Sequence, residues 1–138
     1  MANQNPQPEI YSVVATFPQN SAQGATVQNT ITTSQANNEE VRVYSIQVDM
    51  QAEDNDALDP TTATNCDFSL TIGVGPNNVP SQTIRLRPIW SSEDKMLYFT
   101  TPILILYQQP FTATVTCNQA LPNTPGEGRT ITINFNSD

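Results

Sequence analysis

The sequence predicts an all-β fold: an antiparallel β-sandwich or jelly-roll-like domain of eight or nine strands over residues 10–138, preceded by an extended N-terminal arm over residues 1–9. Apolar and polar residues alternate over many short stretches, and turn-forming Gly, Pro and Asn separate these stretches. No long stretch shows the 3.6-residue period of an amphipathic helix. A parallel α/β fold would need crossover helices, and none can be placed. A length of 138 residues suits one domain.

The strand pattern begins directly after the arm. Its cleanest alternation lies in residues 41–50, where Val41 and Ser45 would share one face and Tyr44 and Ile46 the other. Pro102 splits an apolar segment into two short runs. One helical turn is expected within residues 90–97. We predict strands over residues 10–17, 25–33, 41–50, 67–73, 82–87, 96–100, 103–107, 111–117 and 129–136.

The composition excludes several classes of function. There is no histidine, which rules out His-dependent nucleophilic catalysis and His-ligated zinc. The net charge is −8, with five Lys and Arg in total, so a basic face for nucleic acid is not expected. No apolar run reaches the roughly 18 residues of a membrane span. The carboxylates suggest no catalytic pair, so we expect neither an enzyme nor a cofactor.

The composition also indicates a setting. The N-terminus lacks the basic and apolar regions of a secretory signal, so synthesis in a cytoplasm without a signal peptide is expected. Uncharged polar residues are nevertheless abundant, with 18 Thr, 14 Asn, 12 Gln and 9 Ser, as is typical of proteins that work outside cells. A protein of a virus particle, assembled inside a cell and exposed outside it, would combine the two properties.

The arm is the first candidate partner-binding segment. Pro6 and Pro8 favour extended backbone, and Ile10 begins the apolar pattern. A polar tail of this kind is expected to lie against a neighbouring surface, or else to fold back on its own domain.

The acidic loop over residues 51–65 is a candidate calcium site. Asp54, Asp56 and Asp59 supply the hard oxygen ligands that Ca²⁺ prefers. The EF-hand pattern fails, because Asp59 stands where glycine is required and Asn65 where glutamate is required. A solvated surface loop is the favoured reading, and we predict no metal.

Three further residues are candidates for contact with a partner. Arg85 and Arg87 alternate within a predicted strand and would share a face that meets acidic groups, either on a partner or on the chain itself. Trp90 follows at the strand end, where it would either stack on a sugar or partner, or fill the core.

Cys66 and Cys117 are expected as two buried free thiols, with a disulfide as the alternative.

The general character of the chain resembles the small β-sandwich virion proteins of tailed bacteriophages, especially capsid decoration (cement) proteins. The polar arm, the uninterrupted series of strands and the closing segments 101–107, 110–115 and 130–135 carry this resemblance. It implies a non-enzymatic structural protein on the outer capsid surface of the virion, which binds the major capsid protein and copies of itself as a homotrimer and stabilises the particle. No residue of a family motif is matched.

The alternative is a carbohydrate- or receptor-binding β-sandwich, such as a head fibre, a tail component or a lectin-like domain, with a glycan as its ligand. Neither reading involves nucleic acid or a membrane. The low apolar content also suggests that partner subunits complete the stable unit.

Overall fold

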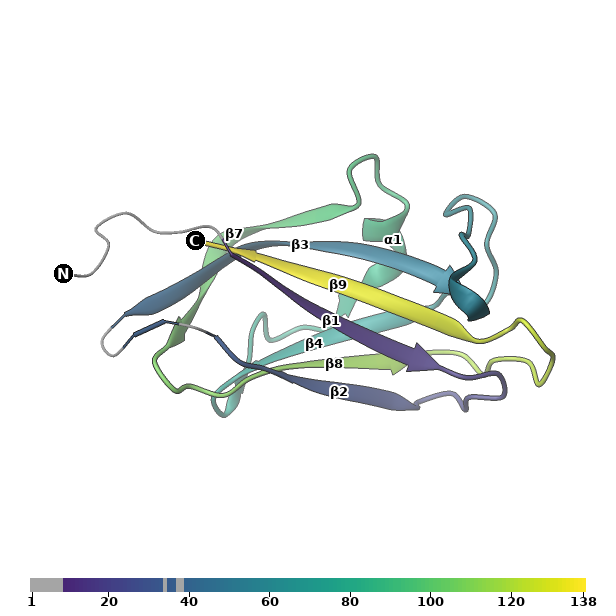
Figure 1. The fold of residues 1–138 in the computed structure, drawn as a ribbon, viewed down its shortest axis with the longest axis horizontal. Coiled ribbons are helices and arrows are strands. Elements are labelled where there is room, and N and C mark those ends of the chain that lie inside the picture. The colour runs from purple at the N-terminus through teal and green to yellow at the C-terminus, as the bar shows by residue number, and fades with distance from the viewer. Residues whose placement is uncertain (1–8, 34, 37–38) are drawn as a thin grey trace.

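Two antiparallel sheets pack face to face in the computed structural model, which describes residues 9–33, 35–36 and 39–138 (Figure 1). Residues 1–8, including Pro6 and Pro8 of the arm, lie outside the described residues. Sheet A contains, in spatial order, β1 (Glu9–Phe17), β9 (Arg129–Ser137), β3 (Glu40–Ala52) and β7 (Met96–Leu106). Sheet B contains β2 (Thr26–Ile31), β8 (Phe111–Cys117), β4 (Phe68–Val74) and β5 (Asn77–Asn78), with β6 (Ile84–Arg85) also paired to β4.

The strand order is that of a jelly roll. The chain pairs as one long folded hairpin: β1 with β9, β2 with β8, β3 with β7, and β4 with β5 and β6. Two further pairings, β3 with β9 and β4 with β8, roll this hairpin into the two sheets. The predicted all-β sandwich is therefore confirmed.

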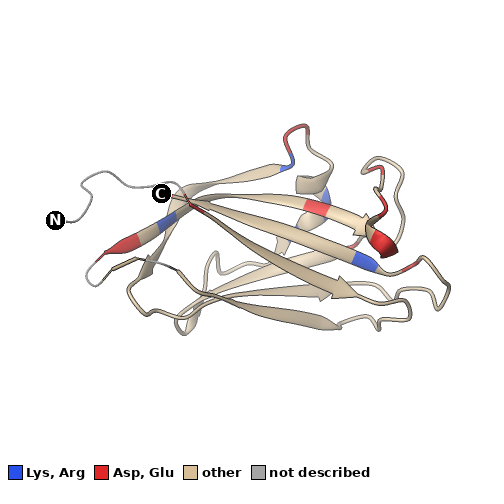
Figure 2. Ribbon diagram, viewed as in Figure 1, with Lys and Arg blue, Asp and Glu red and all other residues tan. Residues whose placement is uncertain are grey.

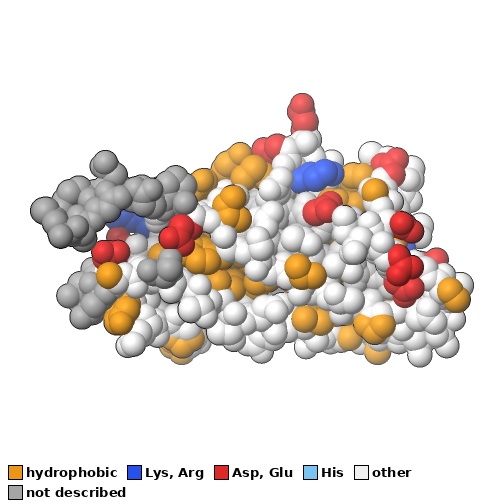
Figure 3. Space-filling model, viewed as in Figure 1, with side chains coloured by type: hydrophobic (Ala, Val, Ile, Leu, Met, Phe, Trp, Pro, Cys, Tyr) orange, Lys and Arg blue, Asp and Glu red, His pale blue; other side chains and the backbone are white. Residues whose placement is uncertain are grey.

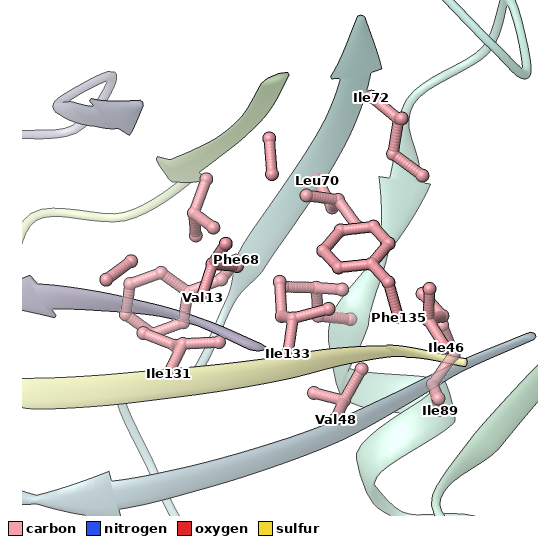
Figure 4. Packing of buried hydrophobic residues seen from close by; sticks show 14 of the residues in the cluster. Val13, Ile46, Val48, Phe68, Leu70, Ile72, Ile89, Ile131, Ile133 and Phe135 are labelled. Atoms are coloured by element: carbon pink, nitrogen blue, oxygen red, sulfur yellow. The ribbon is translucent and has the colours of Figure 1, made fainter. Parts of the chain in front are cut away.

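The core lies between the sheets and follows from the alternation along each strand. In β9, Ile131, Ile133 and Phe135 point inward and are fully buried, while the Thr and Asn residues between them face outward. They meet inward residues of the opposite sheet such as Phe68 and Leu70 (Figure 4). Threonine suits the outward positions because its branched Cβ fits the pleat while its hydroxyl faces water.

The expected alternation within β3 is wrong at one residue. The pairing of β3 with β7 and β9 shifts register between Val43 and Ser45, which marks a β-bulge at Tyr44. The extra residue inverts the pattern beyond it, so Val41, Val43 and Ile46 all face the core. The bulge cannot be predicted from the alternation, because in a regular strand Val43 and Ile46 would face opposite sides of the sheet.

Two other expectations about elements also need correction. β7 is one strand that runs through Pro102, because it is an edge strand and a missing N–H costs nothing on the open side. The strand expected over residues 82–87 is reduced to β6, and the chain then forms α1 (Leu86–Trp90), earlier than the expected helical turn. A 3₁₀ turn, η1 (Glu53–Asn55), lies in the acidic loop.

In the described part of the chain, no helix has the length and apolar character needed to cross a bilayer.

Candidate interaction surface

The exposed large hydrophobic side chains of the described residues gather at one of the two sheets. Among the described residues, every exposed large hydrophobic side chain lies on β1, β3 or β7 of sheet A, or directly after β7. The outward face of sheet B instead carries rows of Thr, Ser and Gln from β2, β8 and β4. The exposed set is Ile10, Val14, Tyr44, Tyr98, Leu104, Leu106 and Tyr107.

Four of these residues form what we call the apolar patch: Tyr44, Tyr98, Leu104 and Leu106. The register brings them together, because Leu104 lies opposite Arg42 of β3 and Tyr98 lies opposite Ser45, on either side of Tyr44. Hydrophobic side chains are visible along the β7 edge at the top of Figure 3. The patch therefore combines two aromatic rings and two leucines at the open edge of sheet A.

The β-bulge gives the patch its shape. Tyr44 lies opposite residues 99–102 of β7, because the register resumes only at Val43 with Ile103 and at Ser45 with Tyr98. At this irregularity Tyr44 is 40% exposed and Tyr98 is 60% exposed. Beside Tyr98, Ser45 is fully buried and accepts a hydrogen bond from Asn136 Nδ2 at 3.0 Å. Ser45 and Asn136 therefore lie between the patch and Ile10, the β1 residue that is paired with Asn136.

The patch itself contains no charged residue, and the one cation beside it among the described residues, Arg42, lies between Glu40 and Asp138. β7 contains no charged residue. Arg42 and Glu40, which lie beside the leucines, form an ion pair at 2.7 Å. Acidic residues gather elsewhere, in the loop after β3 and in the turn between α1 and β7 (Figure 2). The patch can therefore meet an uncharged protein surface without burying an unpaired charge.

Trp90 does not belong to this surface. Its side chain, at the end of α1, is 1% exposed and fills the core. The Arg87 guanidinium lies 5.4 Å and the Lys95 ammonium 5.7 Å from the centre of its ring. The assignment of Trp90 as a contact residue is corrected, because folding α1 against β3 and β4 buries the indole.

The two arginines assigned to a partner are engaged with their own chain. Arg85 forms an ion pair with Asp67 at 2.9 Å, and Arg87 donates to the carbonyl of Pro60 at 3.0 Å. They do not share a strand face, because β6 ends at Arg85 and Arg87 belongs to α1. Ile10, by contrast, is 66% exposed at the start of β1.

The acidic loop does not bring its carboxylates together. Across the residues that the structure describes, no three His, Cys, Asp or Glu side chains form a group able to hold a metal ion. Asp59 Oδ1 instead accepts hydrogen bonds from the backbone N–H and the hydroxyl of Thr61, at 2.9 and 2.7 Å. These bonds, the backbone one first, lower the pKa of Asp59 below its ordinary value.

A polar network that the sequence did not reveal closes the same end of the molecule. Arg129, 5% exposed, donates to the carbonyls of Gly128, Thr64 and Gly126 and to Glu127 Oε2. Glu53 of η1 accepts from the N–H groups of Gly126 and Gly128 at 3.1 and 3.0 Å. The network ties the acidic loop to the loop over residues 118–128. Gly126 and Gly128 are the one sign of this network in the sequence, because a Cβ at Gly128 would meet the Glu53 carboxylate.

Cys66 and Cys117 are buried free thiols. Burial raises the pKa of the Cys117 thiol, whose Sγ donates to the carbonyl of Gln119 at 2.8 Å. Both therefore behave as small core residues.

An open groove of about 460 Å³ lies between the free edges of β1 and β2, lined by residues 10–14 and 29–32. Tyr11 has the one ionisable side chain among the described lining residues, and Tyr11 Oη donates to Glu9 Oε2 at 2.7 Å. The described residues that line the groove include no carboxylate, amine or thiol for acid–base or nucleophilic chemistry.

Comparison with protein-family models, with curated proteins and with solved structures gave no match.

Proposed function

We propose that the chain is a non-enzymatic virion structural protein that decorates the outer surface of a capsid and stabilises the particle. The observation that carries the proposal is the asymmetry between the two sheets: sheet A exposes a cluster of aromatic and aliphatic side chains, while sheet B exposes threonines. Exposed apolar clusters with a polar rim mark protein contact surfaces. The jelly roll is an architecture used by capsid proteins and lectins, which supports the proposal by analogy only.

In this proposal the major capsid protein is the partner, and sheet A faces it. Tyr44 and Tyr98 would enter shallow pockets between capsid subunits, because tyrosine contributes both apolar area and a hydroxyl at interfaces. The arm, with Pro6 and Pro8, would extend the contact to a neighbouring subunit, together with Ile10 at the start of the β-sandwich. Several such contacts on one particle would give tight binding through avidity.

Co-sedimentation with capsids of the virus that encodes the chain tests this proposal. The double substitution Tyr44→Ser with Tyr98→Ser is expected to weaken capsid binding by at least about tenfold, since two buried tyrosines contribute more than 1.4 kcal/mol. The matched control, Thr71→Ser with Thr114→Ser on sheet B, should bind as the wild type does. Equal binding by all three proteins would overturn the assignment of sheet A, and no binding by the wild type would overturn the proposed function.

The same assay tests the arm. Deleting residues 1–9 removes the arm and the first residue of β1, and should weaken capsid binding while the β-sandwich retains its circular dichroism spectrum and its unfolding transition. A truncated protein that binds as tightly as the full chain would show that the arm is not a contact.

A second candidate function is carbohydrate or receptor binding. The exposed rings of Tyr44, Tyr98 and Tyr107 favour it, because sugars stack on aromatic faces at protein surfaces. Glycan-array binding that Tyr98→Ser abolishes would support this candidate, and an array without signal would exclude the glycans it displays.

A further inference from the structure

Among the described residues, no strand pairs with the outer edge of β7. Arg42 exchanges both of its backbone hydrogen bonds with Asp138, with N–H to carbonyl distances of 3.4 and 3.1 Å, so its N–H and C=O point away from β7. Leu104, its neighbour on β7, therefore occupies a non-hydrogen-bonded position of the ladder with β3. The N–H and C=O of Leu104 consequently point outward, away from the sheet.

The neighbouring positions confine this free edge to a short stretch. The N–H of Leu106 donates to the Oε1 of Gln109 at 3.0 Å, and Pro102 has a carbonyl but no N–H. The stretch is self-complementary about Leu104. A second β7 running antiparallel would place Leu104 opposite Leu104 with two N–H···O bonds. Pro102 would lie opposite Leu106 and add no bond, because Gln109 already engages both the N–H and the carbonyl of Leu106.

Charge favours a second copy at this edge over the other free edge of sheet A. Two molecules of net charge −8 repel each other, but β7 carries no charge and the nearby Arg42 and Glu40 neutralise each other. The outer edge of β1 begins at Glu9, and Asn29 Nδ2 of β2 already donates to the carbonyl of Val14 there. β7 is therefore the edge at which another sheet A can dock.

We infer that the chain forms a two-fold dimer in which the β7 strands of two copies pair antiparallel about Leu104. The two copies of sheet A then form one continuous sheet, and the apolar patches of both lie on its outer face. The contact is isologous, unlike the three-fold assembly that the resemblance implies. An edge contact buries less than the roughly 800 Å² per partner of a stable interface, so the dimer should dissociate on dilution.

Sedimentation velocity over a concentration series tests the inference on the full chain. Leu104→Pro removes an N–H that makes no bond to β3, and it should raise the dimer dissociation constant by about tenfold or more, because each copy loses one hydrogen bond. Leu104→Val keeps the N–H and an apolar side chain, and should dimerise as the wild type does. Unfolding curves identify any loss of monomer stability in the Leu104→Pro variant.

Cysteine trapping provides a readout that does not depend on the proline variant folding. In Leu104→Cys the two new thiols would belong to a hydrogen-bonded pair with Cα atoms about 5.5 Å apart, within disulfide range. Mild oxidation should give a covalent dimer in high yield. Thr26→Cys, exposed on the edge strand β2, and the wild type, with its two buried thiols, should give only background.

A wild-type chain that stays monomeric at all concentrations, or sediments as a trimer, overturns the inference. So does a dimer that neither Leu104→Pro weakens nor Leu104→Cys traps. The outcomes separate this inference from the proposed function: a monomer that co-sediments with capsids contradicts only the dimer, and a dimer that does not bind capsids contradicts only the decoration role.

Discussion

Glu53 shows how a single residue closes one end of this sandwich. Its carboxylate accepts from two backbone N–H groups that no strand would satisfy, those of Gly126 and Gly128. Arg129 completes the connection by donating to carbonyls of both loops. Hydrogen bonds that involve a charged group contribute about 1.5–3 kcal/mol each, so this contact matters to a domain of ordinary stability.

We predict that Glu53→Gln lowers the free energy of unfolding by about 1–3 kcal/mol, because the amide NH₂ cannot accept from a backbone N–H. Urea denaturation followed by circular dichroism measures the change. Glu93→Gln, at an exposed glutamate in the turn after α1, should change stability by less than about 0.5 kcal/mol. Equal effects of the two substitutions would show that the Glu53 contact contributes nothing specific.

Trp90 marks the limit of sequence reasoning at the scale of one residue. Its position after Pro88 is compatible with exposure or with burial, and no local pattern distinguishes the two. The structure buries it because α1 packs against β3 and β4, which are distant in the sequence. The apolar patch depends on distant segments in the same way, since pairing Tyr98 with Ser45 is what places it beside Tyr44.

The bulge in β3 is the element on which the candidate surface depends. A regular strand alternates faces, and the sequence of β3 obeys this rule on both sides of Tyr44 but in opposite phase. The bulge allows the apolar residues of both halves of β3 to face the same core, and it leaves Tyr44 on the outer face.

Deleting Tyr44 should therefore be tolerated, because Val41, Val43 and Ile46 would still face the core of a regular strand. Deleting Gln47 should destabilise the fold strongly, because a regular strand would then turn Ile46 to solvent and place Ser45 in the core. Thermal unfolding of both variants checks this prediction. A Tyr44 deletion as damaging as the Gln47 deletion would show that the bulge itself is required for folding.

At the scale of the whole molecule, a net charge of −8 and an uncharged contact edge make opposite contributions to association. Repulsion between two copies is long-ranged and screened by salt, whereas backbone pairing and apolar contact at β7 are not. The acidic residues lie mainly in loops away from the patch (Figure 2).

Dimerisation should consequently strengthen as salt rises from about 0.01 M to about 0.15 M, over which the Debye length falls from about 30 to 8 Å. Sedimentation velocity at each ionic strength measures the dissociation constant. A dimer that weakens with salt would point to a contact built on ion pairs, in place of β7.

The sequence alone determined the fold class and most strands of this protein. Alternation in β1, β4, β8 and β9 is local, and each of these strands lies within about two residues of its predicted bounds. The absence of histidine and the net charge limited the chemistry just as directly. Both follow from residue identity and near-neighbour pattern, which need no knowledge of what lies across the fold.

Only the tertiary structure decided the jelly-roll order, the bulge, the burial of Trp90 and the gathering of the apolar patch. Each depends on pairing between segments far apart in the chain, such as β3 with β7 and β9. A side chain's exposure is set by what packs against it, and the sequence does not state which strand becomes its neighbour. The candidate surface is therefore a property of strand pairing.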